Sequence, residues 1–214
     1  MKLRQKQRET AVFSKHHRIL VDLIVLEISF PLCYISYKRV MPMIPCYYVI
    51  DAKTNHAIPA IIRRATKADF RRTISEHWQT NWQSSFIQSE ELEKYALVIE
   101  HTKELVGLGA YRDMPDGVLV YVEYIESAPN SNPTITENRA YLGIGAALLA
   151  FGVQLSIDYG YGGTIFLKAK TSDLREHYIN KYGALPFSRR DPYLLLIDGE
   201  ASQTLFSQYL KEDD

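Results

Sequence analysis

Short runs of alternating apolar and polar residues predict strands, and other segments repeat their apolar residues at helical spacing. Strands are expected at residues 46–52, 58–63, 95–100, 104–111, 118–126, 164–169 and 193–197. Helices are expected after Thr66 and at residues 89–94, 141–159, 172–181 and 201–210. Thr66 is the expected N-cap of the first helix, whose apolar face would hold Phe70, Ile74 and His77 or Trp78. Short turn-forming gaps join the three middle strands and favour an antiparallel meander. The order predicts a mixed α/β fold with a mostly antiparallel central sheet flanked by helices.

The composition is that of a folded domain. The chain has 214 residues, of which 46% are apolar, enough for a hydrophobic core of its own. Twenty-five basic residues balance twenty-five acidic ones, so the net charge provides no general attraction to nucleic acid or membrane phosphates. The two cysteines, Cys33 and Cys46, have no zinc-type spacing. We therefore expect a reducing, cytoplasmic compartment and no metal.

The first part of the chain has a different character. Residues 1–18 are basic, and the apolar run at 19–35 is interrupted by Asp22 and Glu27. Those charges disfavour a membrane anchor. Two prolines, Pro42 and Pro45, then break regular structure. We expect residues 1–42 to be an extension and residues 43–214 to be the functional domain, with Met41 or Met43 as an alternative start.

Glycines mark the candidate site. No glycine precedes Gly107, and seven of the eleven fall between Gly143 and Gly183. Gly143 and Gly145 open the longest predicted helix, where unpaired N–H groups attract phosphate and glycine allows close approach. Close packing of this helix on the sheet is the alternative explanation. Neither the Rossmann nor the Walker phosphate motif is present.

Three segments resemble the GCN5-related N-acetyltransferase (GNAT) superfamily. They are 61–69 (IIRRATKAD), 143–149 (GIGAALL) and 177–184 (HYINKYGA), in the family's order and spacing. Residues 168–184 also resemble a bacterial subgroup of these enzymes. The resemblance implies the acyl-CoA N-acyltransferase fold, in which two strands part around the pantetheine of acetyl-CoA. The chain departs from the family at Ala140, where Gln or Arg is usual, and in a longer link between Pro129 and Gly143.

The resemblance also implies which residues contact acetyl-CoA. The phosphates would bind the loop at the helix start, and backbone N–H groups of the preceding strand would polarise the thioester carbonyl. The expected contacts are Ile125, Glu126, Ser127, Arg139, Leu142, Gly143, Ile144, Gly145, Ala146 and Ala147.

Three side chains are candidates for catalysis. An amine must lose a proton before it attacks a thioester, so a base or a relaying water is required. Glu123 and Glu126 are the candidate bases, and strand alternation places them on opposite faces unless a bulge intervenes. We favour Glu126, which is nearer the strand end. Tyr178 stands at the family's general-acid position, where it would protonate the leaving thiolate.

The sequence therefore predicts an acetyl-CoA-dependent N-acetyltransferase of unknown amine acceptor. The alternative is a catalytically inactive module of the same fold that binds CoA or another protein. Acetyl-CoA and an amine are the expected partners, a homodimer remains open, and no membrane or metal partner is expected. Nucleic acid is an expected partner only if it is itself the acceptor.

Overall fold

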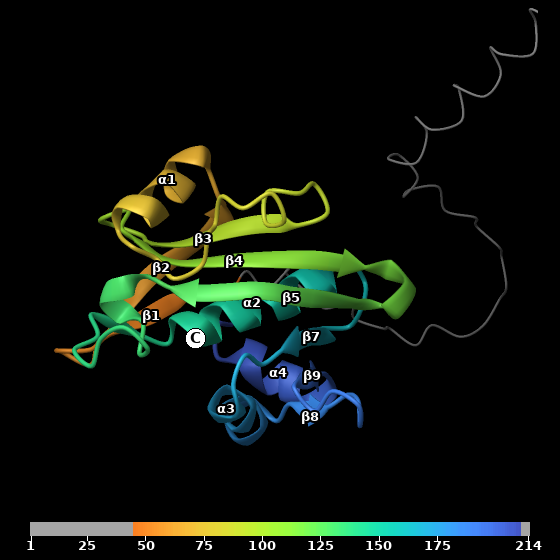
Figure 1. Cartoon of the computed structure of the whole chain (residues 1–214). Coiled ribbons are helices and arrows are strands. Elements are labelled where there is room, and N and C mark those ends of the chain that lie inside the picture. The colour runs from red at the N-terminus through yellow and green to blue at the C-terminus, as the bar shows by residue number, and fades with distance from the viewer. Residues whose placement is uncertain (1–44, 211–214) are drawn as a thin grey trace, which may run out of the picture. The chain divides into compact units, whose positions relative to one another are not determined.

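The computed structural model describes residues 45–210 (Figure 1). The predicted extension at 1–42, its boundary and Cys33 lie outside the described residues. Within residues 45–210, no helix combines the length and the apolar character needed to cross a bilayer.

One sheet organises the described part of the chain. Its strands follow the order β6-β1-β2-β3-β4-β5-β7-β9-β8, and each pairs antiparallel with its neighbour except β5 with β7, which are parallel. The strands are β1 (Tyr48–Asp51), β2 (Ala57–Arg64), β3 (Glu93–Ile99), β4 (Leu105–Met114), β5 (Leu119–Ser127), β6 (Tyr141–Leu142), β7 (Ile165–Lys168), β8 (Leu185–Pro186) and β9 (Leu194–Ile197).

Helices pack on both faces of this sheet. They are α1 (Lys67–Ser75), α2 (Ile144–Asp158), α3 (Ser172–Tyr182) and α4 (Gly199–Ser207), with the short 3₁₀ turns η1 (Pro115–Gly117) and η2 (Pro129–Ser131). One core cluster lies between the sheet and α2 with α4, and the other joins the opposite face to α1 and residues 76–92. Figure 1 shows α1 and α2 on opposite sides of the sheet.

Helix α2 is buried along most of its length because its residues are apolar on every side. Two glycines bring it close to the sheet. A Cβ added to Gly107 of β4 would lie 2.7 Å from Ile144 Cγ2, and one added to Gly152 of α2 would lie 3.3 Å from the Tyr111 ring. Gly107 contacts Ile144, the first residue of α2, and is paired with Ser127, the last residue of β5. The close packing therefore places the start of α2 beside the end of β5.

The fold confirms the predicted class, a mixed α/β sheet that is mostly antiparallel and flanked by helices. Each predicted strand is present with bounds shifted by a few residues at most, and the three middle strands form the expected meander.

Several predictions of local structure are wrong. Residues 89–92 form turns instead of a helix, and Glu93 already begins β3. The apolar side chains of this region are buried without helical spacing, so tertiary packing decides its conformation. Helix α1 ends at Ser75, so His77 and Trp78 lie beyond it. Ile74 lies within the helix but is 64% exposed instead of facing the core. Helix α2 begins at Ile144 instead of residue 141, since Tyr141 and Leu142 form β6.

Thr66 caps α1 as expected and forms a capping box with Asp69. The Thr66 hydroxyl accepts from the Asp69 N–H, and the buried Asp69 carboxylate accepts from the Thr66 N–H at 2.7 Å. Arg63 of β2 donates to both carboxylate oxygens of Asp69, at 2.7 and 2.9 Å. Burial raises the pKa of Asp69, but the Arg63 and Thr66 donors outweigh it and lower the pKa to about 2. The same carboxylate thus ties α1 to the sheet.

Replacing Asp69 with Asn should lower the free energy of unfolding by about 1–3 kcal/mol at pH 7, because the Arg63 guanidinium loses its ionised partner. The folded-state pKa lies below the unfolded value, so the carboxylate stabilises the protein above about pH 4 and stops doing so as pH falls toward 2. Urea unfolding of the wild type and Asp69→Asn across this range should show the difference between them shrinking. A difference independent of pH would contradict the ion pair's role.

Candidate functional site

The cavity of interest begins where β5 and β7 separate. Their parallel pairing consists of three residue pairs and ends at Val122 with Leu167, whereas β5 continues to Ser127. A register shift opposite β4 pairs Tyr124 with Ala110 and Val122 with Tyr111, which leaves Glu123 as the extra residue of a bulge. A bulge bends its strand and increases the local twist. The bulge therefore coincides with the point at which β5 leaves β7.

The separated edge of β5 presents backbone groups to this opening. The Ala128 N–H donates to the Val106 carbonyl at 2.8 Å, so the backbone groups of Ala128 face β4. Backbone direction alternates along a strand, and the N–H and C=O groups of Ile125 and Ser127 therefore point to the opposite edge. That edge lies beyond the last pair with β7. Ile125 and Ser127 both line a cavity of about 340 Å³.

The N-terminus of α2 borders the same cavity. Gly143 is its N-cap, in the left-handed region with φ +82°, and no side chain caps the helix. The first-turn N–H groups of Ile144, Gly145 and Ala146 precede the first intrahelical bond, from Ala147 N–H to the Gly143 carbonyl. Outside its chain neighbours and the backbone of its own helix, no protein atom lies within 4 Å of a Cβ added to Gly145. Open space therefore adjoins the positive end of the α2 macrodipole.

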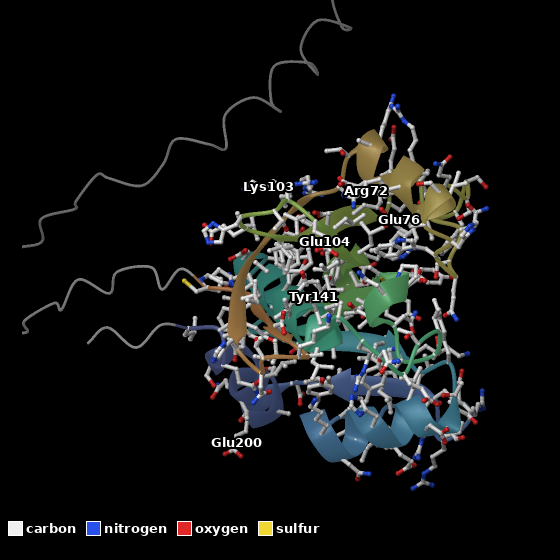
Figure 2. The ribbon with its side chains drawn as sticks, turned by 90° about the vertical axis from the view of Figure 1, so that its left-hand side faces the viewer. Arg72, Glu76, Lys103, Glu104, Tyr141 and Glu200 are labelled. Carbon is white, nitrogen blue, oxygen red and sulfur yellow. The ribbon has the colours of Figure 1, made fainter. Side chains whose placement is uncertain are left out.

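The long link between β5 and α2 forms one wall of the cavity. Its residues Ser131–Thr134 line the space, and Ser131 is buried. The Tyr141 hydroxyl donates to Glu104 Oε2 at 3.0 Å from the end of this link, and Figure 2 shows Tyr141 close to the turn that carries Glu104. Thr134 Oγ1 lies 3.1 Å from Gln79 Oε1 on the other side. The additional length noted in the sequence is therefore folded against its surroundings on two sides.

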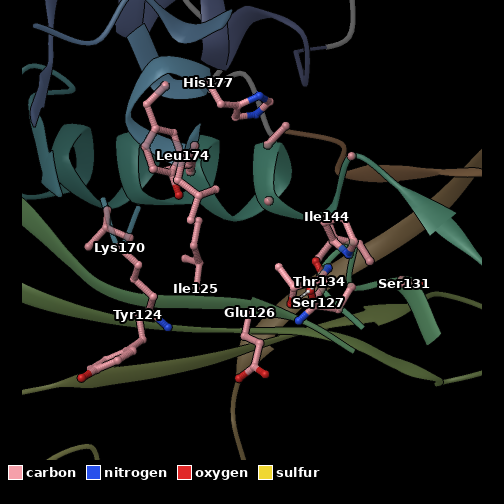
Figure 3. A pocket seen from close by; sticks show the side chains of 18 of the residues that line it. Tyr124, Ile125, Glu126, Ser127, Ser131, Thr134, Ile144, Lys170, Leu174 and His177 are labelled. Carbon is pink, nitrogen blue, oxygen red and sulfur yellow. Dashed lines mark hydrogen bonds between the residues drawn. The ribbon is translucent and has the colours of Figure 1, made fainter. Parts of the chain in front are cut away.

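Glu126 is buried and makes a set of hydrogen bonds that the sequence does not reveal. Its carboxylate accepts from the N–H groups of Gln79 (2.8 Å) and Thr80 (3.2 Å) and from Trp82 Nε1 (2.8 Å). Trp82 itself is fully buried. Figure 3 shows the Glu126 side chain pointing away from Leu174 of α3. Both oxygens are engaged, so Glu126 anchors residues 79–82 beside the cavity.

Glu123 is engaged as well. Its Oε1 accepts from Arg112 Nε at 2.8 Å, and Arg112 also pairs with Glu91 from the segment before β3. Strand alternation would place Glu123 and Glu126 on opposite faces only if β5 had no bulge. The bulge lies at Glu123 itself, so simple alternation does not apply to this pair. Both carboxylates reach partners connected to residues 76–92, Glu126 directly and Glu123 through Arg112.

Tyr178 lines the cavity from α3. Burial raises the pKa of its hydroxyl above the usual value, so this group stays protonated at neutral pH. Its ring lies 6.3 Å from the ring of Tyr182 one turn later. Nearby on α3, burial and the charge of Lys181 lower the pKa of His177, which also lines the cavity. Tyr178 therefore has the protonation state that a proton donor requires.

The structure brings nearly all of the predicted site residues together. Those that line the cavity are Glu123, Ile125, Glu126, Ser127, Arg139, Leu142, Gly143, Ile144, Gly145, Ala146 and Tyr178. Ala147 does not line it, because its side chain is fully buried in the core. The sequence analysis missed other lining residues: Gln79, Ser131, Asn132, Pro133, Thr134, Lys168, Lys170, Leu174, His177 and Lys181. Those of the long link carried a signal in its unusual length, and those between 168 and 184 lie in segments that resemble the family, whereas Gln79 carried none.

Within residues 45–210, no three His, Cys, Asp or Glu side chains form a group that could hold a metal ion. No protein-family model matches the chain. No curated protein matches it either.

Several solved structures resemble the chain. A mutant of the AtaT toxin is 14% identical, with 69% of this chain and 93% of that one covered and a TM-score of 0.44. AtaTR bound with AcCoA is 12% identical, with coverages of 69% and 98% and a TM-score of 0.44. Nourseothricin acetyltransferase is 15% identical, with coverages of 50% and 63% and a TM-score of 0.33. At such values the likeness says nothing about the reaction or the substrates of this chain.

Replacing Glu126 with Gln should lower the free energy of unfolding by about 1–3 kcal/mol, because the new amide directs an N–H₂ group at an N–H donor. Urea unfolding measures the change, and Glu137→Gln, at an exposed position of the long link, is the matched control. Wild-type stability in Glu126→Gln would contradict the anchoring role. Loss of activity at unchanged stability would instead support Glu126 as the base.

Proposed function

We propose that the chain is an acetyl-CoA-dependent N-acetyltransferase. The observation that carries this proposal is the meeting of two sets of backbone donors on one cavity. The edge of β5 beyond Val122 lies on one side, and the uncapped start of α2 lies at its end. A thioester on a pantetheine arm that is joined to a diphosphate has matching chemistry, with amide groups along the arm and negative charge beyond it.

The residues present fit such a molecule. The N–H groups of Ile144 and Gly145 would hold the diphosphate, where the helix macrodipole favours negative charge. Arg139 lines the same cavity although it stands one position away from the family's usual basic residue. Pantetheine amides would pair with the backbone of Ile125 and Ser127 in place of the strand partner that β7 no longer provides.

The reaction joins an acetyl group to an amine. When bound, the thioester supplies an electrophilic carbonyl, whose C–S bond breaks as a C–N bond to the amine forms. N–H groups on the Ile125–Ser127 edge would donate to the carbonyl oxygen as negative charge develops there. Tyr178 would donate its hydroxyl proton to the leaving sulfur, and its raised pKa keeps that proton in place beforehand. The proton lost by the amine reaches solvent.

The contacts of the two glutamates favour water as the immediate acceptor of that proton. Glu126 already accepts from Gln79, Thr80 and Trp82, and Glu123 is paired with Arg112. A carboxylate whose oxygens already accept hydrogen bonds leaves less room to take up the proton of an amine. Glu126 would then act on the reaction by positioning residues 79–82. We place the reaction in the cytoplasm, as the cysteine usage indicates.

Replacing Gly145 with Val tests the cofactor site. A Cβ at this position meets no atom outside its own helical turn, so the fold should tolerate the change while the branched side chain fills the space before the first-turn N–H groups. Acetyl-CoA at 100 times its Kd should stabilise the wild type by about 2.7 kcal/mol. We expect Gly145→Val to lose the corresponding rise in melting temperature and to keep its unliganded melting temperature within a few degrees. An undiminished ligand response would contradict the site.

Replacing Tyr178 with Phe isolates the hydroxyl and keeps the ring. Positioned proton donors contribute roughly 10²- to 10⁴-fold, so kcat should fall at least about tenfold with acetyl-CoA affinity unchanged. Release of CoA thiol in an amine screen measures the change. Tyr48→Phe, outside the cavity, is the control. Unaltered turnover would rule out the general-acid role, and binding of acetyl-CoA without turnover in the wild type would favour the inactive module.

A further inference from the structure

The charges that line the cavity are unevenly compensated. Three cations line it without an ion pair, namely Arg139, Lys170 and Lys181: within residues 45–210, no carboxylate lies within 4.0 Å of them. Lys168 also lines it but is paired with Asp191 at 2.6 Å. The cavity therefore has positive charge that no described side chain neutralises.

Both lining carboxylates are already occupied. Glu123 is paired with Arg112 at 2.8 Å, and its side chain is only 12% exposed. Glu126 is buried and accepts from two backbone N–H groups and the Trp82 indole. Both oxygens of Glu126 are engaged, and the Glu123 carboxylate is largely buried against Arg112, so neither is an open acceptor for an ammonium group of a ligand. A ligand with several positive charges would meet three unpaired cations and no exposed, unpaired carboxylate among the residues that line the cavity.

Lys170 differs from the other two cations in its position. Its ammonium lies 5.4 Å from the centre of the Tyr124 ring, and Tyr124 directly precedes the Ile125–Ser127 edge. Figure 3 shows Lys170 extending toward Tyr124, on the side of the cavity away from Ile144. The Tyr124 ring in turn contacts Phe86 edge-on at 6.3 Å between centroids. Lys170 and Tyr124 thus lie at the end of the cavity remote from the α2 N-terminus.

We propose that the acceptor is a small amine that carries an acid group, a carboxylate or a phosphate, near its amino group, and that Lys170 binds this acid. The inference rests on the proposed function, because it assigns the α2 end to the diphosphate and leaves the Lys170 end for the acceptor. Arg139, four residues before Gly143, belongs to the cofactor end. Polycationic amines are excluded as good acceptors by the same charges.

Matched pairs of amines test the proposal on the full chain saturated with acetyl-CoA. An amino acid is compared with its amide, and O-phosphoethanolamine with ethanolamine, at equal concentrations of unprotonated amine. Spermidine represents the polycations. We expect kcat/KM to be at least about tenfold higher for the acid-bearing member of at least one pair. The pair that responds distinguishes carboxylate from phosphate.

Variants assign the preference to Lys170. Lys170→Gln should abolish it by raising the KM of the acid-bearing amine, with the Kd of acetyl-CoA unchanged, and Lys170→Arg should restore most of it. Lys67→Gln, exposed at the start of α1 and outside the cavity, is the matched control. A preference that survives in Lys170→Gln would overturn the assignment to this residue.

Two readouts separate the failure of this inference from failure of the proposed function. If acetyl-CoA produces no rise in the melting temperature of the wild type, the proposed function fails. If acetyl-CoA binds but neutral amines or spermidine are acetylated as well as the acid-bearing amines, the inference alone fails. The inference also fails if the acid-bearing amines are neither acetylated nor able to change the melting temperature of the protein saturated with CoA.

Discussion

The departure of β5 from β7 is the constraint on which the rest of the site depends. Two parallel strands that stayed paired would satisfy each other's backbone groups and leave no opening. The extra residue at Glu123 bends β5 where its pairing with Leu167 of β7 ends, and the strand continues to Ser127 with one edge unpartnered by β7. Close packing at Gly107 then brings the start of α2 to the end of that edge. A row of backbone donors and a helix N-terminus consequently border one cavity.

Polar side chains hold this arrangement in place at its edges. Glu126 fixes residues 79–82, Arg112 joins the bulge to Glu91, and Glu104 holds the end of the long link through Tyr141. In these contacts the carboxylates accept hydrogen bonds that stabilise the fold, because buried N–H donors need partners. Carboxylates engaged in this way are less able to bind a ligand. The electrostatic character of the cavity is therefore set by cations that have no such structural partner.

Much of the fold was predictable from the sequence because its periodic signals are strong. Alternating strands, the Thr66 cap and the Gly143–Gly145 helix start each have a local cause, and the structure shows all three. The segment at 76–92 was not predictable in this way. Its conformation depends on Trp82 and on Glu126, 44 residues away, and no local pattern records that contact. Strands β6 and β8, of two residues each, exist through their pairing partners and have no signal of their own.

In the candidate site, too, residues in local sequence motifs could be predicted, and residues placed by long-range contacts could not. The residues around Gly143 and Tyr178 could be named because they sit in recognisable local motifs, and the structure places them on one cavity. The relation between Glu123 and Glu126 depended on a bulge whose position is decided by pairing with β4, which the sequence of β5 alone does not specify. Lys170 lies in a segment that resembles the family, but the sequence does not single it out, since its role is inferred from its distance to Tyr124 and from the pairing of the neighbouring charges.

Backbone hydrogen exchange with and without acetyl-CoA tests the central claim most directly, because the account assigns binding to main-chain N–H groups. Saturating acetyl-CoA should slow exchange in two separate stretches, 123–127 on β5 and 143–147 at the start of α2. Exchange in α1 and α4, which do not line the cavity, should be unchanged. Slowed exchange confined to other elements, or unchanged exchange in either of the two stretches while the ligand is bound, would contradict the account.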